Sequence, residues 1–168
     1  MSSIRLTETS YIVLGLLEQA EPATPYDLKQ LAQVSTVNFW SVPHTQLYSE
    51  CARLAQAGLL SEQREQSGRR RRIYRLSELG RERLESWRDE PTDELYEVRD
   101  VGTLKLFFGG DPVKLADAQL QAHTDRLAAY EEMLQDTSDG PRGWRVALEA
   151  GIGHEREFLR FWRKISGN

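Results

Sequence analysis

Two short strand-like segments joined by an arginine-rich turn limit the fold of this chain more than any other feature. Leu60 to Glu65 and Arg72 to Leu76 flank the turn Gln66 to Arg69, in which a Ser-Gly pair suits a tight reversal. Tyr74 and Leu76 share one strand face, whereas the alternation in the first segment is weak. The pattern predicts a two-stranded hairpin in a chain whose other segments favour helices and connectors.

Positive charge gathers at this hairpin in an otherwise acidic chain. The 168 residues carry a net charge of −4, which alone would argue against a polyanionic partner, yet Arg64 to Arg75 holds six arginines against one glutamate. A solvated loop is one reading, but like charges this close repel and are costly without an anionic partner. The sequence therefore predicts that the turn contacts the phosphates or the minor groove of double-stranded DNA, through Gly68, Arg69, Arg70, Arg71 and Arg72.

Two helices are predicted at the start of the chain. Thr7 can cap the first, and Tyr11 to Leu17 supplies more apolar surface than one exposed face could use, so this helix should be largely buried. The break at Glu21 to Ala23 is followed by Thr24 to Asp27, where threonine caps and proline occupies the first helical position. Val34 to Phe39 is β-branched and polar, which favours a connector.

A third helix should begin between Ser41 and His44 and end at Gly58, which suits a left-handed cap. Its apolar face has helical spacing and consists of Leu47, Cys51 and Leu54. Elsewhere on the helix lie polar side chains that can reach base edges or phosphates in a major groove. The predicted DNA-reading residues are His44, Thr45, Gln46, Tyr48 and Ser49.

A fourth helix is predicted after the hairpin. Ser77 can cap it, Leu84 and Trp87 give it apolar surface, and it should end near Pro91. The order helix, helix, helix, hairpin, helix describes a winged helix-turn-helix in which the hairpin is the wing. We therefore expect a mainly α-helical protein, with residues 1–91 as a DNA-binding domain and residues 92–168 as a helical dimerisation domain.

The second half carries two apolar helical stripes. From Pro112 the apolar positions are spaced alternately three and four residues apart, a heptad register formed by Val113, Ala116, Leu120, His123, Leu127, Tyr130 and Leu134. Asp139 to Pro141 should end that helix, and a last helix spans Trp144 to Trp162, where Gly151 and Gly153 allow another backbone to approach. Because narrow stripes pack against other helices, the Val113–Leu134 and Trp144–Trp162 helices are predicted to form a homodimer.

Several of these segments resemble one family of regulators. Pro43 to Tyr48 and Ala52 to Leu60 resemble the recognition helix of PadR-type transcriptional regulators, the phenolic acid decarboxylase repressor family. Gly68 to Gly80 resembles that family's wing and the start of its fourth helix, and Leu104 to Pro112 is similar to the entry of its C-terminal helical domain. The resemblance extends from about Thr7 to Trp162 and is more specific in the first half than in the second.

The resemblance implies a homodimeric, prokaryotic DNA-binding regulator, often a repressor that a small molecule releases. Two-fold symmetry of such a dimer predicts an operator with inverted repeats. The chain departs from the family pattern at Pro25, where glycine is common, and at Ser77, where threonine is common. Neither position belongs to the predicted reading surface.

Catalytic and cofactor motifs are missing from the sequence. His154 to Phe158 begins like the helix motif of zinc proteases, but Phe158 stands where the second histidine would be. Gly151 to Gly153 lacks the preceding strand and third glycine of a dinucleotide loop. With three histidines and one cysteine there is little material for a metal site, so we predict neither an enzyme nor a cofactor.

The compartment also follows from composition. A single cysteine, Cys51, excludes an internal disulfide and is typical of a reducing compartment, where we interpret it as a small buried apolar residue. The apolar run from Tyr11 to Leu17 is too short to span a membrane. We expect a cytoplasmic protein with no membrane partner.

Three questions stay open from the sequence. His123 could be a ligand or pH sensor, or an ordinary histidine of a core or interface, which we favour. Flat aromatic effectors stack well on indole, so the tryptophans could line a ligand pocket or could simply be core residues; they are Trp40, Trp87, Trp144 and Trp162. A winged-helix module that binds protein is the main alternative to a DNA-binding one, and the basic turn at Arg69 to Arg72 argues against it.

Overall fold

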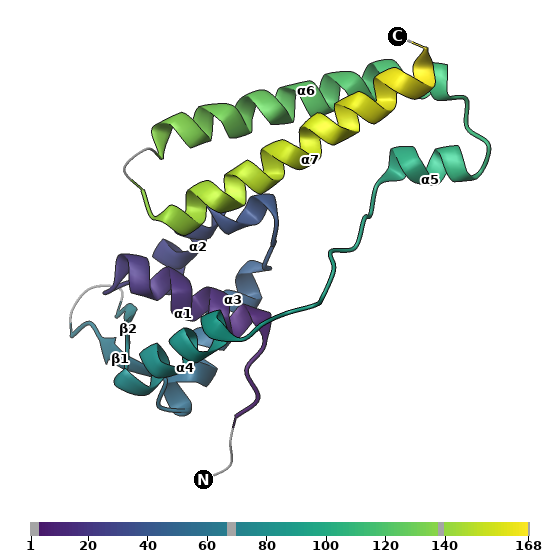
Figure 1. Ribbon diagram of the computed structural model, residues 1–168. Coiled ribbons are helices and arrows are strands. Elements are labelled where there is room, and N and C mark those ends of the chain that lie inside the picture. The colour runs from purple at the N-terminus through teal and green to yellow at the C-terminus, as the bar shows by residue number, and fades with distance from the viewer. Residues whose placement is uncertain (1–3, 67–69, 138–139, 168) are drawn as a thin grey trace. The chain divides into compact units, whose positions relative to one another are not determined.

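The chain folds into two compact units, Met1–Asp93 and Glu94–Asn168. The computed structural model describes residues 4–66, 70–137 and 140–167, and Figure 1 shows the order of their helices and strands. None of the helices in these described ranges is long and apolar enough to cross a membrane.

The first unit has the element order predicted for a winged helix. Its elements are α1 (Glu8–Ala20), α2 (Pro25–Val34), the short 3₁₀ helix η1 (Thr36–Asn38), α3 (His44–Gln56), β1 (Leu60–Arg64), β2 (Arg72–Leu76) and α4 (Glu78–Asp89). The strands pair antiparallel, with Leu60 opposite Leu76 and Arg64 opposite Arg72. The predicted turn residues Gly68 and Arg69 lie outside the described residues. The expected connector from Val34 to Phe39 contains η1, which the β-branched composition did not indicate.

Side-chain caps set where these helices begin. At α2 the Thr24 hydroxyl accepts a hydrogen bond from the Asp27 N–H at 3.3 Å, and the Asp27 carboxylate accepts one from the Thr24 N–H at 2.9 Å. At α4 the Ser77 hydroxyl accepts a hydrogen bond from the Gly80 N–H at 3.0 Å. Each cap satisfies amide groups that the first helical turn leaves without intrahelical partners, which confirms the predicted starts. Gly58 follows α3 with φ of 77°, the left-handed conformation that its role as a cap requires.

The core of this unit lies between α1, α2, α3, α4 and the wing. It is formed by apolar side chains that are almost completely removed from solvent, among them Val13, Leu14, Leu17, Leu28, Leu47, Cys51, Leu54, Leu59, Tyr74 and Leu84. Burial raises the pKa of the Cys51 thiol to about 12, so it stays protonated and unreactive at neutral pH. The face of α3 predicted from spacing is therefore the buried face, and Tyr48 and Ser49, which lie between Leu47 and Cys51, are exposed.

The second unit is helical, as predicted. It contains α5 (Val101–Phe107), α6 (Pro112–Asp136) and α7 (Arg142–Ser166), and α6 and α7 run antiparallel along each other (Figure 1). α6 ends at Asp136, before the break expected at Asp139 to Pro141, of which Asp139 lies outside the described residues. Much of the heptad stripe therefore has a helix partner within its own chain, although Val113 at its start is 61% exposed.

The two glycines of α7 differ in their surroundings. A Cβ atom at Gly151 would lie 3.0 Å from the ring of Tyr130 on α6, so this position requires a small residue. The neighbour that approaches is thus an aromatic ring and not a backbone. At Gly153 a Cβ atom would meet nothing within 4 Å among the described residues, so the expectation of a close approach there is wrong for this chain alone.

Candidate nucleic-acid interface

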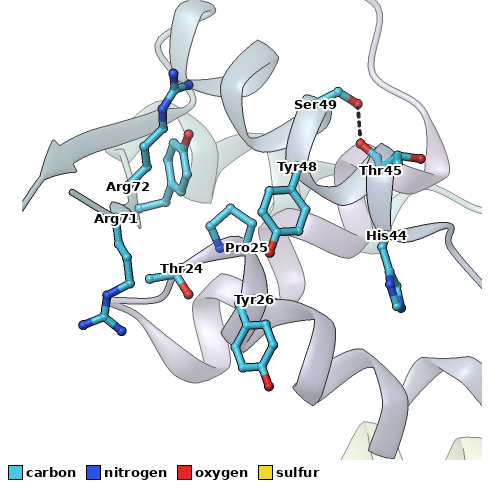
Figure 2. Close-up of a pocket in the computed structure, with 10 residues that line it drawn as sticks. Thr24, Pro25, Tyr26, His44, Thr45, Tyr48, Ser49, Arg71 and Arg72 are labelled. Carbon is cyan, nitrogen blue, oxygen red and sulfur yellow. Dashed lines mark hydrogen bonds between the residues drawn. The ribbon is translucent and has the colours of Figure 1, made fainter. Parts of the chain in front are cut away.

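The N-terminal half of α3 presents the predicted reading residues to solvent. Leu47 and Cys51 anchor the helix in the core, and this fixes the opposite face outward. The exposed residues are His44, Thr45, Gln46, Tyr48 and Ser49. The Ser49 hydroxyl donates to the backbone oxygen of Thr45 at 3.0 Å, so its proton is occupied within the helix (Figure 2).

A groove of about 1050 Å³ runs along this face. Three elements line it: the start of α2, the start of α3 and the wing. Its lining residues are Thr24, Pro25, Tyr26, His44, Thr45, Tyr48, Ser49, Arg71, Arg72 and Tyr74. Figure 2 shows the two arginines at one end, His44 and Thr45 at the other, and the rings of Tyr26 and Tyr48 between them. Six of the ten residues predicted for DNA binding therefore meet in one place.

The other predicted residues have different positions. Gln46 is exposed on α3 but is not among the residues that line the groove. Arg70 is exposed in the wing turn with φ of 48°, a left-handed conformation that is uncommon for a residue with a side chain. Gly68 and Arg69 lie outside the described residues, so their predicted role stays a prediction.

Sequence reasoning missed the contribution of α2. The sequence pattern indicates only a helix start at Thr24, Pro25 and Tyr26, yet all three line the groove. Tyr26 is 54% exposed, and the Lys29 ammonium lies 5.8 Å from the centre of its ring. A signal was present, because Tyr26 is a large aromatic residue off the apolar side of its helix.

The wing arginines have carboxylate partners within the wing itself. The Arg71 guanidinium binds Glu65 in a bidentate manner, with Nε 3.0 Å from Oε2 and Nη2 2.8 Å from Oε1. Arg72 Nε lies 3.7 Å from Glu62 Oε1, and Arg64 Nε donates to the same oxygen at 3.0 Å. The chain itself therefore supplies some of the anions that these arginines need, so they depend less on an external anion than the charge pattern of the sequence predicts.

These pairs shift the acidities of the groups involved. The hydrogen bonds from Arg71 lower the pKa of the Glu65 carboxyl, and the same contact raises the pKa of Arg71. The hydrogen bond from Arg64 is the largest influence on Glu62, whose pKa is also lowered. All of these groups are charged at neutral pH, so the wing presents ion pairs as well as cationic groups to solvent.

A polar network behind the groove holds α3 against α1. Arg53 donates from Nε to Glu50 Oε2 at 2.8 Å and from Nη2 to the hydroxyl of Ser10 at 3.0 Å. Burial alone would raise the pKa of Glu50, but hydrogen bonds from Arg53 and Ser10 outweigh burial and lower it. The network joins α3 to the first turn of α1, where the Ser10 hydroxyl also accepts a hydrogen bond from the Thr7 N–H at 2.8 Å.

In the second unit, His123 belongs to a packed helix pair. Its Nδ1 lies 2.5 Å from Glu155 Oε2, and its ring stacks on Phe158 with centroids 4.8 Å apart. Both partners lie on α7, so this histidine joins α6 to α7. The arrangement accounts for the histidine as an interhelical contact.

The tryptophans occupy several environments. Trp162 is fully buried in the second unit, whereas Trp40 and Trp87 are each nearly half exposed in the first. Trp87 stacks on Tyr11 at 4.5 Å, which gives it a structural partner. Within the described parts of the chain, no group of three or more histidine, cysteine, aspartate or glutamate residues could hold a metal ion.

A three-helix core, a two-stranded wing and a groove between them define the first unit as a winged helix-turn-helix. Residues 13–86 match the transcriptional regulator PadR-like family, and residues 98–166 match the C-terminal region of virulence activator alpha. The negative transcriptional regulator PadR of Bacillus subtilis (strain 168) is 30% identical over 173 residues, covering 92% of this chain and 93% of that protein. The chain belongs to the PadR-like family of transcriptional regulators, which is a family of regulators and not of enzymes.

Solved structures show the same fold. B. subtilis PadR in complex with operator DNA has a TM-score of 0.81 at 21% identity, covering 94% of this chain and 96% of that one. The same protein in complex with p-coumaric acid has a TM-score of 0.78 at 20% identity, covering 94% and 96%. The Vibrio cholerae virulence activator AphA has a TM-score of 0.71 at 22% identity, covering 95% and 96%.

Proposed function

We propose that this regulator binds DNA by placing the start of α3 in a major groove, with the wing and the start of α2 on the flanking phosphates. The observation that carries the proposal is the shared groove, which brings two helix starts and the wing arginines to one face. A major groove admits one helix, and side chains near its N-terminus reach base edges. This arrangement favours a module that binds DNA over one that binds protein.

The residues of the groove then have distinct tasks. His44, Thr45 and Gln46 lie at the start of α3, where they would contact bases. Tyr26 and Tyr48 are exposed phenols that would donate to phosphates, as would Arg71 and Arg72. We assign contacts with the DNA backbone to four further residues as well. Ser49 lies on the same helix as His44 and Thr45, and Gly68, Arg69 and Arg70 directly precede Arg71 in the sequence.

We further propose that residues 92–168 join two copies of the chain. In α5 and in the segments next to it, the second unit exposes large apolar side chains, which we take together as the surface around α5: Leu95, Val98, Val101, Leu104, Phe107 and Phe108. An apolar surface of this kind marks an interaction site. It would add to the interface predicted from the Val113–Leu134 and Trp144–Trp162 helices, whose facing sides are already packed on each other.

Two recognition helices on a two-fold axis require an operator with inverted repeats. We propose that the dimer acts as a repressor, in line with its 30% identical relative, a negative transcriptional regulator. We also propose that a small aromatic molecule releases it, in line with the p-coumaric acid complex of that relative. Because its target is chromosomal DNA, we expect it in the cytoplasm.

Selection of bound fragments from the host genome, followed by footprinting, tests this function. We expect an inverted repeat whose half-site centres lie about one helical turn apart, and binding that weakens steeply with salt. Sedimentation of the same preparation should give a dimer. If no fragment is recovered above background, or if binding does not depend on salt, the protein groove does not bind DNA in the proposed way.

A further inference from the structure

The ion pair between Arg71 and Glu65 has the form of an occupied anion site. Three donors of Arg71 converge on this carboxylate: Nε at 3.0 Å, Nη2 at 2.8 Å and the backbone N–H at 3.3 Å. The backbone of Glu65 is held in place as well, because its N–H donates to the Arg71 carbonyl oxygen at 3.0 Å. The Glu65 carboxylate therefore lies on a fork of three Arg71 donors, at the edge of the protein groove that we propose binds DNA.

A phosphodiester group can replace a carboxylate on such a fork. Arginine binds both anions through two parallel N–H donors to two oxygens, so the same geometry serves either. The side chain of Glu65 is about one quarter exposed and that of Arg71 is 61% exposed, so solvent and DNA can reach the pair. Exposed pairs of this kind contribute little to stability, so opening this one does not threaten the fold.

Glu62 provides the contrast. Its carboxylate accepts one hydrogen bond from the hydroxyl of the buried Tyr74 at 3.0 Å and another from Nε of Arg64 at 3.0 Å. Nε of Arg72 lies 3.7 Å from the same carboxylate. Because one of its partners is fixed in the core, this carboxylate is part of the wing framework. All of the hydrogen bonds found to the Glu65 carboxylate among the described residues come from Arg71, so this carboxylate can be displaced in a single step.

We propose that Nε, Nη2 and the backbone N–H of Arg71 form a phosphodiester-binding site, filled by Glu65 in the free protein and by a DNA phosphate in the complex. The inference rests on the proposed DNA-binding function and names one of its contacts. Once displaced, the Glu65 carboxylate remains beside the DNA backbone and repels it. Glu65 thus lowers the affinity for every DNA sequence and reduces the salt dependence of binding.

The test uses full-length protein and a random-sequence DNA duplex, with the dissociation constant measured over a range of salt concentrations. Glu65→Gln keeps the shape of the side chain and removes its charge. We expect it to tighten binding about three- to tenfold at about 0.1 M salt and to steepen the slope of log K against log salt by up to about 0.9. Glu85→Gln, the same charge change at an exposed position of α4 outside the groove, should alter neither quantity.

A double-mutant cycle shows whether Glu65 acts through Arg71. Arg71→Ala should weaken binding, and Glu65→Gln should bring a clearly smaller gain in the Arg71→Ala background, because only the repulsion between the Glu65 carboxylate and the DNA is left to remove. If Glu65→Gln leaves affinity unchanged or weakens it while Arg71→Ala also weakens it, Glu65 merely orients the arginine and the exchange does not occur. If Glu65→Gln tightens binding equally with and without Arg71, the shared site is disproved. Wild-type protein that fails to bind any duplex would instead contradict the proposed function.

Discussion

Ala23 and Tyr74 are joined by two backbone hydrogen bonds, from the Ala23 N–H to the Tyr74 oxygen at 3.1 Å and from the Tyr74 N–H to the Ala23 oxygen at 2.8 Å. Ala23 directly precedes Thr24, the cap of α2, and Tyr74 lies in β2. The start of α2 and the wing therefore belong to one hydrogen-bonded frame. This fixes the spacing between Tyr26 and the wing arginines, so both can meet one DNA backbone in a single orientation.

The first prediction concerns Tyr26 at one edge of this frame. Tyr26→Phe should weaken binding to all DNA sequences alike by about three- to tenfold, because one hydrogen bond to a phosphate contributes about 0.7–1.4 kcal/mol. Anisotropy with operator and random duplexes measures both affinities. Tyr11→Phe is the matched control, since Tyr11 stacks on Trp87 and is not among the groove-lining residues. A loss confined to the operator would show that Tyr26 reads bases.

The second prediction concerns base readout by α3. His44→Ala and Gln46→Ala should each relax sequence preference at one or two operator positions, at about 1–3 kcal/mol for a good base contact. Both side chains are exposed, so the melting temperature should hardly change. Selection from a randomised operator library gives the preference of each variant. Identical preferences for both variants and the wild type would remove these residues from the reading surface.

The sequence predicted the frame of the first unit because its signals are local. Caps at Thr24 and Ser77 and the spacing of Leu47, Cys51 and Leu54 depend on contacts within a few residues or on a single helix face. The outward face of α3 follows from its buried face without any tertiary information. For this reason the predicted reading residues are exposed as expected.

The rest depends on contacts between distant segments. The pairing of Ala23 with Tyr74 brings the start of α2 to the wing, and no local pattern encodes a contact between residues so far apart. Glu65 and Arg71 are six residues apart and meet only when the two strands pair. A count of charges in the sequence does not show this contact, so it predicts unpaired arginines in this segment. Heptad spacing showed that α6 needs a helix partner, but spacing is the same for a partner in the same chain or in another.

The third prediction compares two glycines. A Cβ atom at Gly80 would collide with the carbonyl oxygen of Leu59, which directly precedes β1, so Gly80→Ala must shift α4 away from this backbone and should lower the free energy of unfolding by about 1–3 kcal/mol. At Gly15, inside α1, a Cβ atom would meet nothing within 4 Å among the described residues. Gly15→Ala should therefore raise the free energy of unfolding by about 0.5–1 kcal/mol. Denaturant melts decide, and a stable Gly80→Ala variant would contradict this packing.

The fourth prediction concerns Glu50 and pH. Because the pKa of Glu50 is lower in the folded state, its ionised form stabilises the fold above the unfolded-state pKa, and this stabilisation is lost as pH falls through the folded-state pKa. Glu50→Gln should lower the free energy of unfolding by about 1–3 kcal/mol at pH 7, since it leaves Arg53 without its charged partner in a partly buried site.

The difference in stability between wild type and Glu50→Gln should begin to shrink as pH falls below about 4.5, the ordinary pKa of this carboxyl, where the unfolded chain takes up a proton. It should be lost as pH falls through the lower folded-state pKa, where the carboxyl becomes neutral in the fold as well. Urea melts at pH 7 and at several acidic values measure the difference. Glu85→Gln, at an exposed position within α4 away from its first turn, serves as a control for the change of net charge. A difference that stays constant down to the lowest pH would show that the charge of Glu50 does not matter.

The last prediction concerns the surface around α5. Phe107 and Phe108 are 81% and 77% exposed, so replacing both by serine removes little packing within one chain and should not unfold it. If two copies meet there, the double variant should be monomeric by sedimentation at micromolar concentration and should bind an inverted-repeat operator orders of magnitude more weakly, because the second half-site no longer binds intramolecularly. Its preference at each half-site should be unchanged.

Val34→Ser, which removes a similarly exposed apolar side chain from the first unit, should remain a dimer. A double variant that sediments and binds like the wild type would place the dimer contact on the outer faces of α6 and α7 instead.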